Sequence, residues 1–145
     1  MSKVFKGRVI VGGHYEGEAL VTHQGFNILA TYFRGISTGS EICWDQNNKD
    51  LYQKVLKDKV LCLPKAIGST TGGMFLQCAA DGNIAPKAML YANTVDSVSV
   101  AGIIMSDIWN NRKIITVDGL GKEFLDAVQD GQKITVEEDG TVIVD

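Results

Sequence analysis

One stretch of the sequence constrains the fold of this chain most. In it, a short apolar run is followed by a turn rich in glycine and hydroxyl residues, and then by a helical pattern. The run Val60-Leu61-Cys62-Leu63 predicts a short buried strand. Pro64 ends this strand, because proline has no N–H group to donate to a sheet ladder. The residues that follow predict a helix over 72–81. Ser69 is therefore expected in a strand-to-helix turn, with the helix beginning near Thr71.

The turn ahead of this helix suits two roles, and the sequence leaves both open. The first N–H groups of a helix have no partner inside the helix, and they point toward the turn. With hydroxyl groups added, such a turn can hold a carboxylate or a phosphate. Alternatively, Ser69, Thr70 or Thr71 is an ordinary helix N-cap, the role that Ser and Thr most often have at this position. The two roles are compatible, since a capping loop can also bind an anion.

The second half of the chain alternates strand and helix patterns. The expected elements are strand 60–63, helix 72–81, strand 87–91, helix 97–109, strand 114–117, helix 122–129, and a hairpin of strands 133–137 and 141–144. The Asp139-Gly140 pair is a strong signal for the two-residue turn of that hairpin. In helix 97–109 the apolar residues recur at helical spacing, at Val98, Ala101, Ile104, Met105 and Ile108.

The first half is expected to consist mostly of strands. The expected elements are strands 3–11, 18–22, 27–33 and 41–44, a glycine-rich loop over 34–40, a polar turn over 45–50, and a helical turn or irregular connection over 51–57. A strand-rich half followed by an alternating half predicts an α/β fold with parallel central strands and an additional β layer. The length suits a single domain over residues 1–145.

Charge and hydropathy exclude several classes of partner. The formal net charge is −3 and the isoelectric point is near 5.3, which argues against nucleic-acid binding because that function needs a basic face. No apolar run approaches the ~18 residues of a membrane span. The segment Met1 to Arg8 lacks the apolar core of a signal peptide. We therefore expect a cytoplasmic protein without a membrane partner.

The three cysteines, Cys43, Cys62 and Cys78, do not suggest a disulfide framework, because their number is odd and no signal sequence accompanies them. None belongs to a Cys-x-x-Cys pair, and each is expected to be a small buried apolar residue. His14 and His23 are isolated from one another and from the cysteines. The chain is therefore expected to hold no metal ion or iron–sulfur cluster by itself.

Six short motifs occur along the chain in an order and spacing that are specific when taken together. They are Gly17-Glu18-Ala19-Leu20-Val21, Thr38-Gly39, Lys59-Val60-Leu61-Cys62-Leu63-Pro64, Gly68-Ser69, Ala85-Pro86-Lys87-Ala88, and Val117-Asp118 ahead of the C-terminal hairpin. In this order they resemble the small subunit, or swivel domain, of the aconitase X group of dehydratases. The resemblance runs from about Gly7 to Val144.

The resemblance implies a fold, a partner and a reaction. The fold would be of the swivelling β/β/α type. The partner would be an aconitase X-type large subunit that carries the iron–sulfur cluster. The reaction would be the dehydration of a small hydroxy acid, of the cis-3-hydroxy-L-proline or the 5-phosphomevalonate type. The serine of the Gly-Ser motif acts in this family as the base that removes a proton from carbon, and that role falls on Ser69.

Elementary chemistry agrees with these implied roles. A dehydratase removes a proton from a carbon next to a carboxylate and expels hydroxide, which an iron site can assist as a Lewis acid. A serine can be the base only if its alkoxide is stabilised, and helix N–H groups do this. The groups expected to hold the substrate carboxylate are Thr70, Thr71 and the backbone of Gly68 and Gly72. Lys65 either adds positive charge or is a solvated surface residue.

The chain departs from this family at two positions. Ile67 stands where family members often have arginine just before the Gly-Ser pair, and Cys43 stands where they tend to have aspartate. The first change removes a cation from beside the expected base. These departures support an alternative, in which the chain is a non-catalytic module that binds a small ligand or regulates a partner while retaining the swivel fold.

Overall fold

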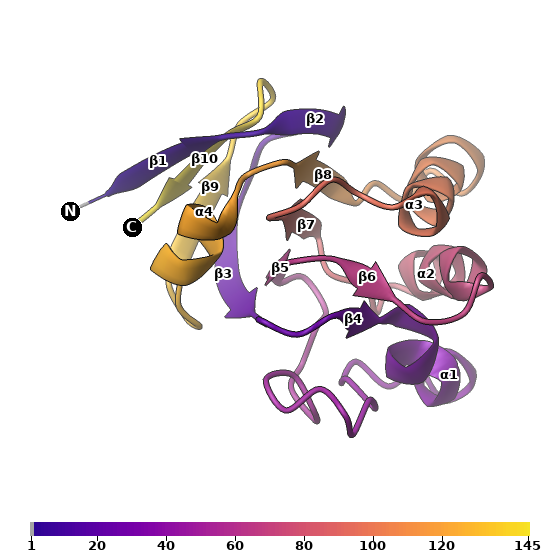
Figure 1. Ribbon diagram of the computed structural model, residues 1–145. Coiled ribbons are helices and arrows are strands. Elements are labelled where there is room, and N and C mark those ends of the chain that lie inside the picture. Colours follow the sequence, from indigo (N-terminus) through magenta and orange to yellow (C-terminus); the bar gives the residue numbers. More distant parts are fainter. Residues whose placement is uncertain (1) are drawn as a thin grey trace.

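The computed structural model describes residues 2–145 and shows a curved mixed sheet with three helices side by side on one of its faces (Figure 1). The strands of the main sheet are β1 (Lys3–Lys6), β2 (Arg8–Val11), β3 (Tyr15–Val21), β5 (Val60–Leu63), β7 (Ala88–Tyr91), β8 (Ile115–Asp118), β9 (Lys133–Val136) and β10 (Thr141–Val144). A separate two-stranded ribbon joins β4 (Phe26–Asn27) and β6 (Ala66–Ile67). The helices are α1 (Ile28–Thr38), α2 (Gly72–Asp81), α3 (Ser97–Trp109) and α4 (Lys122–Ala127).

The strand order of the main sheet is β1-β10-β9-β3-β5-β7-β8-β2, and β3, β5, β7 and β8 are parallel to their neighbours within that group. The two outermost strands, β1 and β2, are consecutive in the chain and are separated by Gly7, so the sheet curls back toward itself. The expected strand over 3–11 is thus two strands. A side chain at Gly7 would meet the carbonyl oxygen of Asp118, with its Cβ 2.5 Å away, which explains the glycine at this break.

The parallel strands separate two apolar cores. Ala19, Val60 and Ala88 lie in register across β3, β5 and β7 and face the core inside the curled sheet. The adjacent residues of these strands face the other way, into the core beneath α1, α2 and α3, because successive side chains of a strand alternate between its faces. The result is two β layers and one helical layer, as the swivelling β/β/α prediction requires.

Most elements of the second half agree with the sequence prediction. The strand at 60–63, the helix at 72–81 and the helix at 97–109 have the predicted bounds. The hairpin strands and α4 match to within two residues. Within residues 2–145, no helix has the length and apolar character to cross a membrane.

The predicted strand over 27–33 and the predicted loop over 34–40 are wrong, because helix α1 occupies residues 28–38. The β-forming residues in this segment suggested a strand, but Ile28, Tyr32 and Gly35 are spaced as one helical face and are all buried. The Asn27 side chain caps the helix by accepting a hydrogen bond from the N–H group of Ala30, at 3.1 Å. Burial of this face outweighs local strand propensity.

The apolar residues of helix α3 that recur at helical spacing face mainly outward, whereas those of a core helix would face the protein interior. The residues that face the protein are Ser99, Gly102, Ile103 and Ser106. Ile104, Met105 and Ile108 from the predicted apolar series are exposed instead. The helix was therefore correctly located by its periodicity, but the apolar stripe that located it lies mainly on the outer surface.

Two of the three cysteines are buried as expected, whereas Cys78 is exposed on α2. Burial is the main cause that raises the pKa of the Cys43 and Cys62 thiols, which keeps both thiols neutral. The prediction for Cys78 failed because the neighbouring residues Leu76 and Ala79 supply the buried face of α2.

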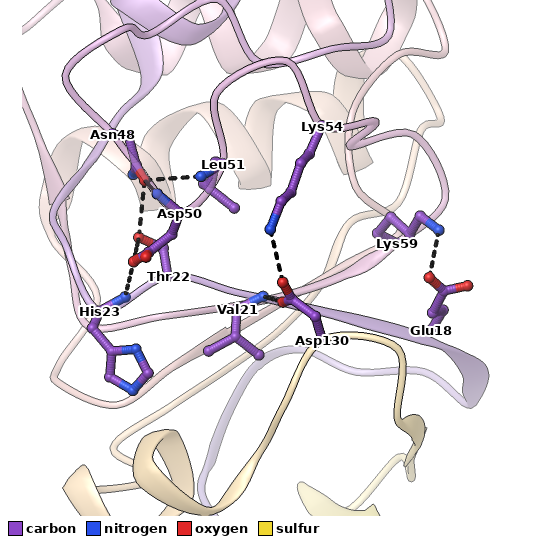
Figure 2. A network of polar contacts seen from close by, with 10 residues as sticks. All are labelled: Glu18, Val21, Thr22, His23, Asn48, Asp50, Leu51, Lys54, Lys59 and Asp130. Atoms are coloured by element: carbon purple, nitrogen blue, oxygen red, sulfur yellow. Dashed lines mark hydrogen bonds and ion pairs between the residues drawn. The ribbon is translucent and has the colours of Figure 1, made fainter.

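The segment between α1 and β5 has little regular structure, and polar contacts tie it to the end of β3 (Figure 2). The predicted strand over 41–44 reduces to isolated bridges at Ile42 and Cys43. The Thr22 hydroxyl donates to side-chain oxygens of Asn48 and Asp50, at 3.2 and 3.1 Å. Side-chain hydrogen bonds thus replace a sheet ladder in fixing this segment.

Asp118 is a buried carboxylate at the end of β8, and its hydrogen bonds connect β2 to the loop before α3. Arg8 donates to both of its oxygens, at 2.9 and 2.6 Å, and the N–H group of Val95 donates at 2.7 Å. Burial opposes ionisation of Asp118, but these hydrogen bonds and the Arg8 charge outweigh it and hold the pKa of Asp118 below its ordinary value.

This lowered pKa predicts a specific loss of stability in acid. A carboxylate with a lower pKa in the folded state stabilises the protein above its unfolded pKa, and that stabilisation is lost as the pH falls toward the folded pKa. We expect the free energy of unfolding of the wild type to fall as the pH drops below about 4. Asp118→Asn should be less stable at pH 7 and should show a shallower decline, measured by urea unfolding between pH 7 and 3. Parallel curves for the two proteins would contradict the assignment.

Candidate functional site

The glycine-rich turn lies at the carboxyl ends of β5 and β7, the edge of a parallel sheet at which ligands usually bind. Between β5 and α2 the chain first forms β6, which pairs with β4 through Ala66 and Ile67. The turn over 68–71 follows this pair directly and leads into α2. The short β4–β6 ribbon therefore fixes the direction from which the chain enters the turn.

The Ser69 hydroxyl oxygen lies within hydrogen-bonding distance of two groups of Thr71, its backbone N–H and its side-chain hydroxyl. Its Oγ accepts from the N–H group of Thr71 at 3.2 Å and lies 2.9 Å from the Thr71 Oγ1. The carbonyl oxygen of Ser69 accepts from the N–H group of Gly72 at 2.9 Å. Ser69 thus satisfies N–H groups at the start of α2, as an N-capping residue does. The Thr71 side chain makes no capping bond.

The hydrogen bonds from Thr71 to the Ser69 hydroxyl oxygen also affect how readily this hydroxyl can lose its proton. Hydrogen bonds to an ionised oxygen favour the ionised form, and a negative charge at the N-terminus of a helix is stabilised by the helix dipole. The Ser69 Oγ is at such a terminus, and the hydroxyl of Thr71 can turn to donate to it. The Ser69 side chain is also exposed, so a substrate can reach it.

Gly68 shapes the turn by its backbone conformation. Its φ is +103°, in the region that residues with a Cβ rarely adopt. A Cβ at this position would also lie 2.6 Å from the Oδ1 atom of Asn27, the residue that caps α1. Gly68 therefore allows the turn to pass close to the start of α1.

A small cavity of about 60 Å³ adjoins the turn, and the N-terminal residues of α1, α2 and α3 all border it. The residues around it are Ile28, Ala66, Ile67, Gly68, Ser69, Gly72, Asp96 and Val98. Asp96 is its one charged residue, and the Asp96 Oδ2 caps α3 by accepting from the N–H group of Ser99 at 2.8 Å. The other carboxylate oxygen, Oδ1, is buried and has no hydrogen-bond partner within the described chain.

Sequence reasoning did not single out Asp96. A usable signal was present, because an aspartate that directly precedes a helical pattern is a typical N-cap. This pattern identifies Asp96 as the cap of α3, but it does not reveal that Asp96 lies near Ser69. The two residues are 27 positions apart and line the same cavity because β5 and β7 are neighbours.

The structure brings together most of the residues expected at the site. Gly68, Ser69 and Gly72 line the cavity, and Thr71 contacts Ser69. The exposed Thr70 borders a separate groove between α2 and α3.

Neither Lys65 nor Ile67 places a charged side chain in the cavity. Lys65 is exposed ahead of β6 and is not among the residues that line the cavity or the groove. Ile67 is 47% exposed, and its side chain lies against the backbone of Gly25. Ile67, noted above as a departure from the aconitase X pattern, therefore lines the cavity with an apolar side chain.

The described residues do not fit an iron–sulfur cluster. Residues 2–145 contain no group of three or more His, Cys, Asp or Glu side chains that could hold a metal ion. Cys43 and Cys62 are buried, and Cys78 lies on the surface of α2. The part of the chain that the structure describes thus provides no ligand set for a cluster.

Comparison with known families gives a match over almost the whole chain. The family described as the aconitase X swivel domain matches residues 4–144. The chain belongs to this family. The match confirms the resemblance that the six sequence motifs suggested.

Curated relatives and a solved structure agree with this membership. The phosphomevalonate dehydratase small subunit of Thermococcus kodakarensis is 30% identical over 134 residues, which cover 92% of this chain and 90% of the relative. The protein of the same name from Aeropyrum pernix is 28% identical and covers 97% and 92%. The crystal structure of Thermococcus kodakaraensis aconitase X in its holo-form superimposes with a TM-score of 0.82, at 29% identity over 98% of each chain.

Proposed function

We propose that this swivel domain is the small subunit of an aconitase X-type dehydratase and supplies the serine base to an active site shared with a large subunit. The observation that carries the proposal is the position of Ser69. Its exposed hydroxyl lies at the N-terminus of α2, accepts the Thr71 N–H, and borders a cavity that Asp96 also lines. The relatives named phosphomevalonate dehydratase small subunit support the assignment as a dehydratase small subunit.

In the proposed reaction, Ser69 takes a proton from a carbon next to the substrate carboxylate. The electron pair of the broken C–H bond forms a carbon–carbon double bond, and the neighbouring hydroxyl leaves as hydroxide. Hydroxide takes up a proton to become water, and Ser69 returns its proton to solvent before the next turnover. The Thr71 N–H and hydroxyl stabilise the serine alkoxide before it reacts.

The remaining residues of the turn are proposed to bind the substrate. Gly68, Thr70, Thr71 and Gly72 would hold its carboxylate. The Thr71 and Gly72 N–H groups already bond to Ser69, so the substrate must share or displace these bonds. Lys65 lies outside the cavity, so its proposed role is limited to positive charge near the rim.

The proposed substrate is 5-phosphomevalonate, the compound after which the relatives are named. The reaction also requires a group that assists departure of the hydroxide. We place the iron–sulfur cluster that can do this in the large subunit, because residues 2–145 lack a ligand set for it. The contribution of this chain is then the base and part of the substrate pocket.

Reconstitution with the cognate large subunit tests this function. We expect the two purified chains, mixed under anaerobic conditions, to dehydrate 5-phosphomevalonate, while neither chain does so alone. Formation of the unsaturated product is followed by ultraviolet absorbance and mass spectrometry, with cis-3-hydroxy-L-proline as the comparison substrate. Turnover of the proline derivative alone would replace the proposed substrate. An iron-loaded complex that turns over neither compound would favour the non-catalytic binding module.

A further inference from the structure

Helix α3 presents a row of large apolar side chains to the outside. Ile104 and Met105 are 38% and 40% exposed, and Ile108 and Trp109 at its C-terminal end are 73% and 76% exposed. Met74, on the adjacent helix α2, is 57% exposed. We refer to these five residues as the helical apolar face. Exposed apolar residues that gather on neighbouring elements commonly mark an interaction site.

The packing of α2 against α3 explains why these side chains point outward. The two helices meet through Gly73 and Gly102, and a Cβ at Gly102 would collide with the backbone of Gly73. Such close contact requires small residues on the inner side of α3, where Ser99 and Ser106 are buried alongside Gly102. The larger apolar residues of α3 are therefore left mainly on its outer side.

The helical layer also carries few charges. Helices α1, α2 and α3 together contain three charged residues, Arg34, Asp81 and Asp107, although charged residues make up 21% of the whole chain. Helix α4, which belongs to the other side of the molecule (Figure 1), has three charged residues among its six. Depletion of charge is typical of the centre of a protein–protein interface.

The helical apolar face is continuous with the proposed active site. A groove of about 320 Å³ runs between α2 and α3, and its lining includes Met74 and Met105 from the apolar face. The same groove is lined by Thr70, the residue next to Ser69. A partner that covers Ser69 along this groove would therefore also cover Met74 and Met105.

We propose that the helical apolar face is the surface on which the large subunit docks. This inference rests on the proposed function, because that function requires a partner over Ser69. The partner surface would be apolar and nearly uncharged, with a side chain that enters the groove between Met74 and Met105. A second copy of this chain suits the position less well, because it would cover Ser69 without bringing a cluster to it.

Charge substitutions on this face test the inference. Met105→Glu and Ile108→Glu should each weaken binding of the cognate large subunit by about 100-fold, since each would bury an unpaired charge at the interface. Binding is measured by biolayer interferometry with purified, iron-loaded large subunit. Val4→Glu is the matched control, because Val4 is also apolar and 65% exposed but lies on β1. It should change the dissociation constant by less than twofold.

The outcomes separate this inference from the proposed function. If the wild-type chain binds the large subunit and both α3 variants bind equally well, the docking surface is wrong while the shared site stands. If the wild-type chain does not bind the large subunit, the proposed function itself fails. Sedimentation of the chain alone tests for self-association. If the wild-type chain is a dimer that the α3 variants dissociate, and if their binding to the large subunit is unchanged, the face serves self-association and the inference is overturned. Far-ultraviolet circular dichroism verifies that every variant is folded.

Discussion

Ser69→Ala is expected to lower the kcat of the assembled enzyme by about 10²–10⁴-fold, the usual contribution of a positioned general base. The substitution removes the oxygen that accepts the Thr71 N–H, so a small loss of stability, about 1 kcal/mol, should accompany it. Assembly with the large subunit should remain intact, because the helical apolar face is unchanged. Steady-state turnover and binding to the large subunit are measured on the same preparations.

Two further variants distinguish the base from a simple helix cap. Ser69→Asn keeps a good capping oxygen but cannot act as the proposed base, so it should restore stability without restoring turnover. Ser37→Ala is the matched control, since the Ser37 hydroxyl bonds only within α1, to the carbonyl of Arg34. It should leave kcat unchanged. If Ser69→Asn recovered wild-type turnover, Ser69 would be a structural cap and the base would have to be another residue.

Gly73→Ala is expected to destabilise the protein by about 2–3 kcal/mol, through overpacking where α2 crosses α3. The added Cβ would collide with the carbonyl oxygen of Val98, which is backbone and cannot rotate away. The helices would have to move apart, which would also deform the groove beside Thr70. Urea unfolding, monitored by Trp fluorescence and circular dichroism, gives the change in the free energy of unfolding.

The neighbouring glycine provides a control in the same helix. The nearest atom to a Cβ at Gly72 would be the Cβ of Ile28, 3.5 Å away, and alanine favours helix formation over glycine by up to about 1 kcal/mol. Gly72→Ala should therefore be neutral or stabilising. Equal destabilisation by the two variants would show that the contact with α3 does not determine the cost of Gly73→Ala.

The sequence located the elements whose signals are local. The apolar run of β5 followed by Pro64, the spacing in α3, and the Asp139-Gly140 turn each depend on residues close together in the chain, and each predicted element is present. Helix α1 was missed because strand-forming residues competed with a helical spacing of buried positions at Ile28, Tyr32 and Gly35. Burial decided that competition, and burial depends on the neighbouring elements.

Much of the candidate site could also be predicted from local sequence. The order of strand, glycine-rich turn and helix placed Ser69 at the start of α2, and the family match agrees with the motifs that drew attention to it. The contribution of Asp96 could not be predicted in this way. It depends on the adjacency of β5 and β7, which brings the starts of α2 and α3 to one cavity.

The amino-acid sequence by itself determined that α3 is a helix with an apolar stripe, but only the tertiary structure decided which way the stripe faces. Periodicity reports that apolar residues share a side, and it carries no information about what lies opposite that side. The contact between Gly73 and Gly102 draws the small side of α3 inward, because backbones can approach this closely only where side chains are absent. That long-range contact leaves Met105 and Ile108 exposed, on the surface where we place the large subunit.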